Sequence, residues 1–275
     1  MRILLVTDTH LSPDSDDTVS NWQSTRTFAE RANADITLHL GDITRDGWST
    51  PSELPYAASL ADDWPTPIRF LPGNHDIGDN PPGPDLASGQ PMSHELLETY
   101  RSHFGPDYWA FDEPGNDTGW LLVGINAQLM ATNTEDEETQ WNWLHTTLDR
   151  AGTRPVALFS HKPMFQNALD DEPPHIRYIP TLPRTRLRTL LQNVDCRLYA
   201  SGHTHQFLDR MQGTTRHIWT PSSAYRFSDK MQEKIGEKVV GLGLLELHTS
   251  EDGHRTSFDL VAPEGMQQFE RTITA

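Results

Sequence analysis

Residues 2–10 read Arg-Ile-Leu-Leu-Val-Thr-Asp-Thr-His, an unbroken apolar run that closes on an aspartate and a histidine. Such a run is typical of a buried parallel strand, because both faces of that kind of strand are covered. Asp8 and His10 therefore follow the carboxyl end of a predicted strand. In α/β sheets, ligands collect at these strand ends.

The same arrangement recurs along the chain. Further strands are predicted over residues 35–40, 67–71, 120–125, 155–159 and 196–200, and helices over 20–32, 51–61, 94–104, 134–150 and 185–192. Strands over 217–221, 239–248 and 257–262 then follow without intervening helices, which favours antiparallel pairing. This order predicts an α/β fold (α+β in a looser scheme) with two sheets. We expect one domain over residues 1–275, in which the strands from about residue 217 complete the second sheet.

Composition bounds the class of protein. The 275 residues include 22 Lys and Arg against 39 Asp and Glu, a formal net charge of −17, and a single cysteine, Cys196. This acidity argues against a nucleic-acid polymer as partner, because Lys and Arg supply most of the affinity for phosphate backbones. A disulfide scaffold is excluded, no apolar run approaches the roughly 20 residues of a membrane helix, and the first residues do not resemble a signal peptide. We expect a cytoplasmic protein without a membrane partner, with Cys196 as a core thiol.

Five predicted strands end in polar clusters. These are Asp8-x-His10, Gly41-Asp42, Gly73-Asn74-His75-Asp76, His161 and Gly202-His203-x-His205. A single strand-end Asp is usually a turn residue or helix cap, and a single buried His is usually hydrogen-bonded structure. Five clusters at successive strand ends instead favour one shared site. Residues two apart in an extended segment point to the same side, so each Asp-x-His or His-x-His pair can face one centre.

The types of side chain indicate a metal centre. Mixed carboxylate and imidazole ligands suit Mn, Fe, Zn or Co better than Ca or Mg. Two carboxylates, one Asn and four His are too many for one ion, and they fit two ions that share a bridge. Glycine at 41, 73 and 202 allows the backbone to turn sharply or to approach closely at these strand ends.

This set of motifs resembles the signature of the calcineurin-like metallophosphoesterases, in the expected order between residues 3 and 205. The resemblance implies a two-sheet β-sandwich flanked by helices. It places on one metal Asp8, His10, Asp42 and His205. It places on the other metal Asp42, Asn74, His161 and His203, so that Asp42 bridges the two ions. His75 is implied to lie beside the leaving-group oxygen without binding a metal, and Asp76 is interpreted as a turn cap or a support for His75.

The resemblance also implies the chemistry. Two ions lower the pKa of a bridging water, and the resulting hydroxide attacks phosphorus in line while the ions hold the phosphoryl oxygens. His75 can donate a proton or a hydrogen bond to the leaving oxygen. We expect a small anionic phosphate ester as substrate, because it can reach the ions through the acidic surface.

Two likenesses compete over which ester is cleaved. Thr7-Asp8-Thr9-His10-Leu11 and Gly41-Asp42-Ile43-Thr44 are similar to class III cyclic-nucleotide phosphodiesterases. Gly73 to Gly78, Phe104 to Tyr108 and Asn126-Ala127-Gln128 are similar to proteins that include a serine/threonine protein phosphatase. We favour a phosphodiesterase acting on small substrates such as cyclic nucleotides. The alternative is a phosphomonoesterase of protein phosphatase type. A non-catalytic metal-binding scaffold is less favoured, because no ligand is replaced.

Four residues outside the ligand set are candidate substrate contacts. Arg45 and Lys162 are cations beside the motifs and could touch phosphate, with a surface position as the alternative. Asn126 and Gln128 follow a strand and could line the pocket, with turn capping as the alternative. The loop over 77–92 leaves directly from Asn74-His75 and lacks any period, so we expect it to border the substrate.

Overall fold

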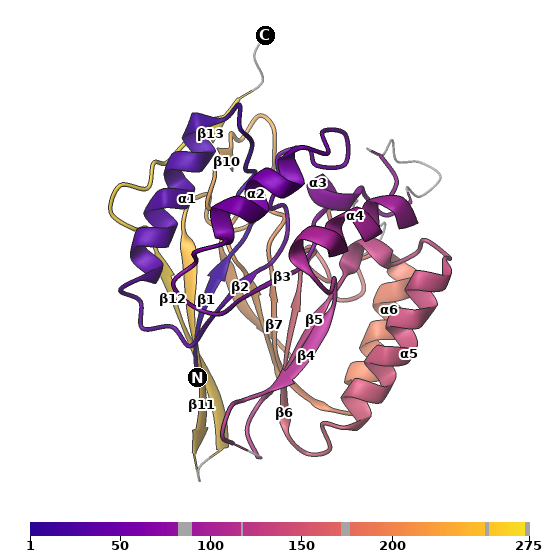
Figure 1. Cartoon of the computed structure of the whole chain (residues 1–275). Coiled ribbons are helices and arrows are strands. Elements are labelled where there is room, and N and C mark those ends of the chain that lie inside the picture. The colour runs from indigo at the N-terminus through magenta and orange to yellow at the C-terminus, as the bar shows by residue number, and fades with distance from the viewer. Residues whose placement is uncertain (82–89, 117, 172–176, 251–252, 273–275) are drawn as a thin grey trace.

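Two β-sheets form the centre of the computed structural model, which describes residues 1–81, 90–116, 118–171, 177–250 and 253–272 (Figure 1). The five-stranded sheet, in spatial order, contains β12 (Gly253–Val261), β11 (Leu242–Ser250), β1 (Arg2–Val6), β2 (Ile36–His39) and β3 (Ile68–Phe70). The six-stranded sheet contains β4 (Trp109–Asp112), β5 (Leu121–Ile125), β6 (Pro155–Ser160), β7 (Asp195–Ser201), β9 (Thr215–Trp219) and β8 (Leu208–Gln212). A separate parallel ribbon pairs β10 (Arg226–Phe227) with β13 (Glu270–Arg271).

Helices cover the outer faces of the sheets. The described residues include α1 (Asp16–Ala29), α2 (Glu53–Ala61), α3 (Asn74–Ile77), α4 (His94–Phe104), α5 (Glu135–Asp149), α6 (Thr181–Leu191) and the 3-10 turn η1 (Ala127–Leu129). Figure 1 shows α1 and α2 beside the first sheet and α5 and α6 beside the second. The prediction of an α/β fold with two sheets flanked by helices is confirmed.

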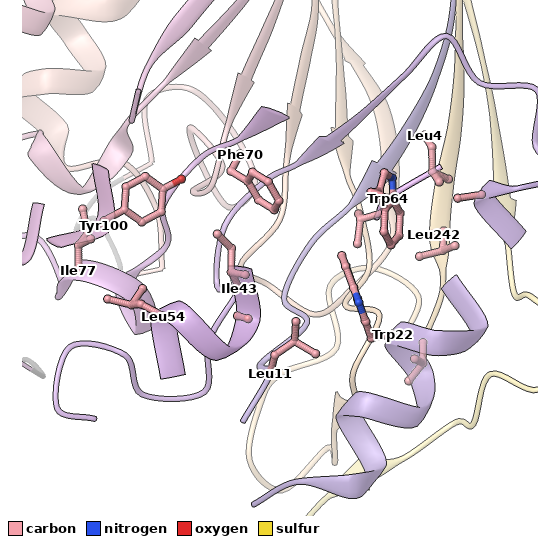
Figure 2. Close-up of a cluster of buried hydrophobic side chains, with 14 of the residues drawn as sticks. Leu4, Leu11, Trp22, Ile43, Leu54, Trp64, Phe70, Ile77, Tyr100 and Leu242 are labelled. Atoms are coloured by element: carbon pink, nitrogen blue, oxygen red, sulfur yellow. The ribbon is translucent and has the colours of Figure 1, made fainter. Parts of the chain in front are cut away.

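The position of β1 between two apolar clusters explains why its sequence is apolar on both faces. Ile3 and Leu5 point into the core between the two sheets, where they meet residues of the second sheet such as Phe159. Leu4 points the other way, into a cluster that includes Trp22 of α1 (Figure 2). Since successive side chains of a strand alternate between faces, a strand buried on both sides needs an unbroken apolar run.

The late strands differ from expectation. We expected the strands from about residue 217 to complete the second sheet, but the structure divides them between the sheets. Strand β9 lies between β7 and β8, whereas β11 pairs antiparallel with β1 and carries β12 at the edge of the first sheet. The apolar face of β11 explains this placement, because Leu245 and Leu247 join the core between the sheets.

Several boundaries also differ. Helix α1 begins at Asp16, four residues before its predicted start, with Asp16 and Asp17 placed favourably in the first turn. Helix α6 begins at Thr181, since Pro183 is tolerated in a first turn. Strands β4 and β8 and the ribbon were not predicted. Of the expected loop over 77–92, residues 82–89 lie outside the described part of the chain.

Among the described residues, no helix has both the length and the apolarity that a bilayer crossing requires.

Candidate metal centre

The five polar clusters meet at one end of the two packed sheets. They follow the carboxyl ends of β1, β2, β3, β6 and β7. Within the first sheet, the Asp8 N–H donates to the Gly41 carbonyl over 2.9 Å. Across the sheets, the His203 N–H donates to Asp8 Oδ2 over 2.9 Å. Five loops from two sheets therefore surround one point.

One group of converging atoms consists of Asp8, His10 and His205, all buried. His10 Nε2 lies 3.2 Å from His205 Nε2, and His205 Nε2 lies 3.4 Å from Asp8 Oδ1. Because the ligand atoms of all three lie within 4.8 Å of one another, a single ion can contact them together.

A second group consists of Asp42, His161 and His203. His161 Nε2 lies 3.0 Å from His203 Nδ1 and 3.4 Å from Asp42 Oδ1. Asn74 Oδ1 is 3.3 Å from the same His161 nitrogen, so the predicted amide ligand also belongs here.

Asp42 joins the two groups. Its Oδ1 faces His161 of the second group, and its Oδ2 lies 3.9 Å from His10 Nε2 of the first. One carboxylate thus offers a different oxygen to each group. This is the geometry expected of a carboxylate that bridges two ions.

The donor chemistry of the site fits metal ions. His161 Nδ1 lies 2.9 Å from the Leu40 carbonyl, and His205 Nδ1 lies 2.7 Å from the Tyr225 carbonyl. A carbonyl only accepts, so each Nδ1 carries a hydrogen and each Nε2 is directed to the centre, where it can supply a lone pair to a metal ion. Asp8 Oδ1 is also buried without a hydrogen-bond partner among the described residues. Converging lone pairs of this kind repel one another unless a cation lies among them.

The electrostatics differ between the ligand rings. Burial alone would lower the pKa of His161, but Asp42 and Asp8 outweigh it and raise that pKa. Burial lowers the pKa of both His10 and His203 well below 6.5, which keeps these rings neutral. Burial alone would raise the pKa of Asp42, but His161, His75 and His10 outweigh it and hold that pKa well below its usual range. Asp42 therefore remains a carboxylate across the ordinary pH range.

The backbone of the ligand loops is strained. Five of the predicted ligands have φ between 46° and 66°, in the left-handed region: Asp8, His10, Asp42, His203 and His205. Non-glycine residues held in this region cost on the order of 1–3 kcal/mol each and persist only where the surroundings impose the conformation. Such strain is concentrated at functional sites.

Glycine is required where the loops touch. A Cβ on Gly73 would lie 2.1 Å from Asp42 Oδ1, and a Cβ on Gly41 would lie 2.6 Å from His161 Nδ1. Gly41 also has φ of 105°, so it satisfies both predicted reasons for glycine, whereas Gly73 allows only the close approach.

Asp76 joins two of the ligand loops. Its carboxylate accepts hydrogen bonds from Thr44 N and Gly73 N, each at 2.8 Å, and from Ile43 N at 3.2 Å. The same carboxylate accepts a further bond from Thr44 Oγ1 at 2.8 Å. Asp76 is therefore a support for the loops after β2 and β3, and the support of His75 comes from elsewhere.

His75 is held by its Nδ1 at the open side of the centre. This nitrogen lies 2.5 Å from the Arg45 carbonyl and 3.4 Å from Asp46 Oδ1, while 32% of the side chain is exposed. Burial alone would lower the pKa of His75, but Asp42 and Asp46 outweigh it and raise the pKa to about 10. The His75 ring nevertheless lies close to the ligand groups, since its centroid is 4.7 Å from that of His10 and one of its nitrogens lies within 4.8 Å of ligand atoms of His10 and Asp42. Sequence reasoning missed Asp46, because no spacing pattern marks it.

The family model for calcineurin-like phosphoesterases matches residues 1–207. The chain belongs to the calcineurin-like phosphoesterase family. It is thus a metal-dependent phosphoric ester hydrolase, from a family that uses a dinuclear metal centre and acts on small phosphate esters. The two groups of side chains described above are the candidate ligands of this phosphoesterase.

Curated relatives of this phosphoesterase divide between two activities. It is 24% identical over 234 residues to the 3',5'-cyclic adenosine monophosphate phosphodiesterase CpdA of Pseudomonas aeruginosa, covering 81% of this chain and 74% of CpdA. It is 25% identical over 150 residues to the mouse serine/threonine-protein phosphatase CPPED1, covering 52% of this chain and 43% of CPPED1. In fold it is similar to a dimetal phosphatase from Danio rerio, with a TM-score of 0.60, 13% identity and coverage of 89% and 92% of the two chains.

Two of the four predicted substrate contacts of the phosphoesterase, Asn126 and Lys162, have other partners in the structure. Asn126 Oδ1 accepts from Gln128 N at 2.9 Å, which is the capping interaction considered as its alternative. The Lys162 ammonium is buried and donates to Asp79 at 2.5 Å and to Asn80 at 2.6 Å.

The remaining two candidates differ from each other. Arg45 lies beside His75, but its guanidinium is 3.4 Å from the buried Glu53 carboxylate and 3.7 Å from Asp46. Gln128 is fully buried, and its side-chain amide has no partner among the described residues. Contacts of either residue with substrate remain predictions.

Proposed function

We propose that this phosphoesterase hydrolyses small phosphodiesters, with cyclic nucleotides among them, at a two-ion centre. The proposed ligands are Asp8, His10, Asp42, Asn74, His161, His203 and His205. The observation that carries the proposal is the Asp42 carboxylate, with one oxygen 3.4 Å from His161 and the other 3.9 Å from His10. When bound, two ions lower the pKa of a water molecule and neutralise charge on the phosphoryl oxygens.

The residues of the chain supply positioning and a proton. The Nδ1–carbonyl contacts of His161 and His205 fix their rings, so that the geometry of the centre is set before substrate arrives. His75, held by Arg45 and Asp46, is proposed to donate a hydrogen bond or proton from Nε2 to the leaving oxygen. General acid catalysis of this kind contributes roughly 10²–10⁴ in rate.

A phosphodiester is favoured over a monoester by the extent of the likeness to CpdA. That match covers 81% of this chain, compared with 52% for CPPED1. The second candidate, a protein phosphatase activity, is supported by the CPPED1 match alone. A non-catalytic scaffold is less favoured, because every proposed ligand and His75 are present.

We also infer a single domain over residues 1–275. The N-terminal amine of Met1 donates to the Leu247 carbonyl at 2.9 Å, and β11 completes the sheet that β1 begins. The first and last thirds of the chain therefore share one sheet. A cytoplasmic location remains a prediction from the sequence.

One panel tests the function. The substrates are a monoester, a diester, 2',3'- and 3',5'-cyclic nucleotides, glycerophosphodiesters and a phosphopeptide, each supplied with Mn, Fe, Zn or Co. We expect chelation to abolish hydrolysis, Mn to restore it, and kcat/KM to be highest for a diester. A preference for the phosphopeptide would support the second candidate, and no hydrolysis of any ester with any metal would refute the proposal.

A further inference from the structure

The guanidinium of Arg271 lies at the edge of the metal centre. Its Cζ is 3.8 Å from the centroid of the Tyr225 ring. That ring is 5.0 Å from the His10 ring and 4.8 Å from the His205 ring. A single aromatic ring therefore separates this cation from two proposed metal ligands.

The β10–β13 ribbon fixes this position. Arg271 pairs with Phe227, and the Ser228 N–H donates to the Arg271 carbonyl over 3.0 Å. Side chains alternate along such strands. Tyr225 and Phe227 both pack on the His205 ring, at 4.8 and 4.7 Å. On the same strands, Arg226 and Glu270 form an ion pair with each other at 3.2 Å.

Arg271 differs from two other cations beside the centre, Arg45 and Lys162. Arg45 is paired with Glu53, and Lys162 is paired with Asp79. The Arg271 side chain is exposed, and within the described residues its guanidinium has neither a carboxylate partner nor a hydrogen-bond acceptor. An uncompensated cation beside the centre of a chain with net charge −17 is available to an anionic ligand.

Ring contacts connect Arg271 to His75. The Tyr225 ring, on which Arg271 stacks, is 5.0 Å from the His10 ring, and the His75 ring is 4.7 Å from that same His10 ring. Asp46, which contacts His75 Nδ1, has a lowered pKa; the hydrogen bond with His75 is the main cause, and the charge of Arg271 contributes. His75 lies beside the leaving oxygen in the proposed function, so a leaving group that extends from His75 past the His10 and Tyr225 rings would reach Arg271.

We propose that Arg271 is a specificity residue that binds a second anionic group, a carboxylate or phosphate, carried by the leaving group of the substrate. The stacking on Tyr225 fixes the plane of the guanidinium and leaves its N–H edge free for a two-point hydrogen bond to such a group. This inference rests on the proposed function, because it assigns the substrate class of the same site.

The test compares two chromogenic diesters that differ by one carboxylate on the leaving group: methyl 4-nitrophenyl phosphate and its 3-carboxy analogue. Wild-type protein, Arg271→Gln and Arg271→Lys are assayed with Mn, and Arg255→Gln serves as a charge-matched control on an exposed residue of β12. For Arg271→Gln we expect KM for the carboxylated diester to rise about tenfold, or about 1.4 kcal/mol. The kcat for that diester, and both constants for the plain diester, change less than twofold.

The other variants sharpen the result. Arg271→Lys is expected to lose part of this selectivity, because an ammonium cannot form the two-point contact. Arg255→Gln is expected to leave both diesters unaffected. Equal changes for the two diesters in Arg271→Gln, or no change for either, would overturn the assignment.

A second readout separates this inference from the proposed function. If the wild-type protein hydrolyses neither these two diesters nor any ester of the panel above with any metal, the proposed function fails. Calorimetric Kd values of both diesters for the Mn-treated protein then decide the role of Arg271. About tenfold tighter binding of the carboxylated diester that is lost in Arg271→Gln supports the assignment, whereas equal binding of the two diesters by the wild-type protein overturns it.

Discussion

Asp76 offers a sharp test of how the ligand loops are held. Its buried carboxylate accepts bonds from three backbone N–H groups, those of Ile43, Thr44 and Gly73, and from the Thr44 hydroxyl. Asp76→Ala removes all four hydrogen bonds at once. A buried donor left without a partner costs about 1–3 kcal/mol, so three such donors cost about 3–9 kcal/mol before water enters the cavity. We expect a loss of about 3–5 kcal/mol in the free energy of unfolding.

The measurement is urea unfolding of the chelated protein, followed by circular dichroism, so that metal binding does not contribute to the stability. Asp62→Ala, at an exposed Asp that follows α2, is the matched control and should change the free energy of unfolding by less than about 0.5 kcal/mol. If the free energy of unfolding of Asp76→Ala lies within about 1 kcal/mol of that of wild type, Asp76 does not support the loops after β2 and β3 in this way.

Three further predictions concern single side chains. His75→Ala should keep both metals but lower kcat roughly 10²–10⁴-fold on a poor leaving group, and an unchanged kcat would exclude its acid role. The Cys196 thiol should resist Ellman's reagent at pH 8 in the folded protein, because burial raises its pKa to about 12; rapid labelling without denaturant would contradict this. Burial and Arg210 lower the pKa of His217 from 6.5 to about 4, so between these values the unfolded chain binds more protons and stability falls as the pH falls, by up to about 3 kcal/mol. His217→Gln should reduce this loss in unfolding experiments between pH 6.5 and 4.5, and an identical pH dependence would show that His217 is not buried as a neutral ring.

The metal centre could be predicted from the sequence because its signals are local. Each ligand directly follows an apolar strand, and parallel strands bring their carboxyl ends to one edge. The ligands Asp8 and His10 could therefore be placed without knowledge of the whole fold. Their left-handed backbone could not, because the neighbouring loops impose it.

The position of Arg271 near the centre could not be predicted, because it depends on contacts between distant parts of the chain. Strand β13 has only two residues and no periodicity, and its place depends on pairing with β10, more than forty residues earlier in the chain. Asn126 shows a further limit of prediction from sequence. A polar residue that follows a strand gives the same sequence pattern whether it lines a pocket or caps a turn. The bonds from Gln128 N to Asn126 Oδ1 and from Asn126 Nδ2 to Asp107 distinguish the two.

The bridging role of Asp42 is the central claim, and metal content tests it most directly. Wild-type protein and Asp42→Asn are loaded with Mn, freed of excess ion by buffer exchange, and analysed by plasma mass spectrometry. An oxygen of Asp42 faces each ligand group, so we expect two ions per chain in the wild type and one or none in the variant. Two fully occupied ions in Asp42→Asn, or a single ion in the wild type, would contradict the bridged centre.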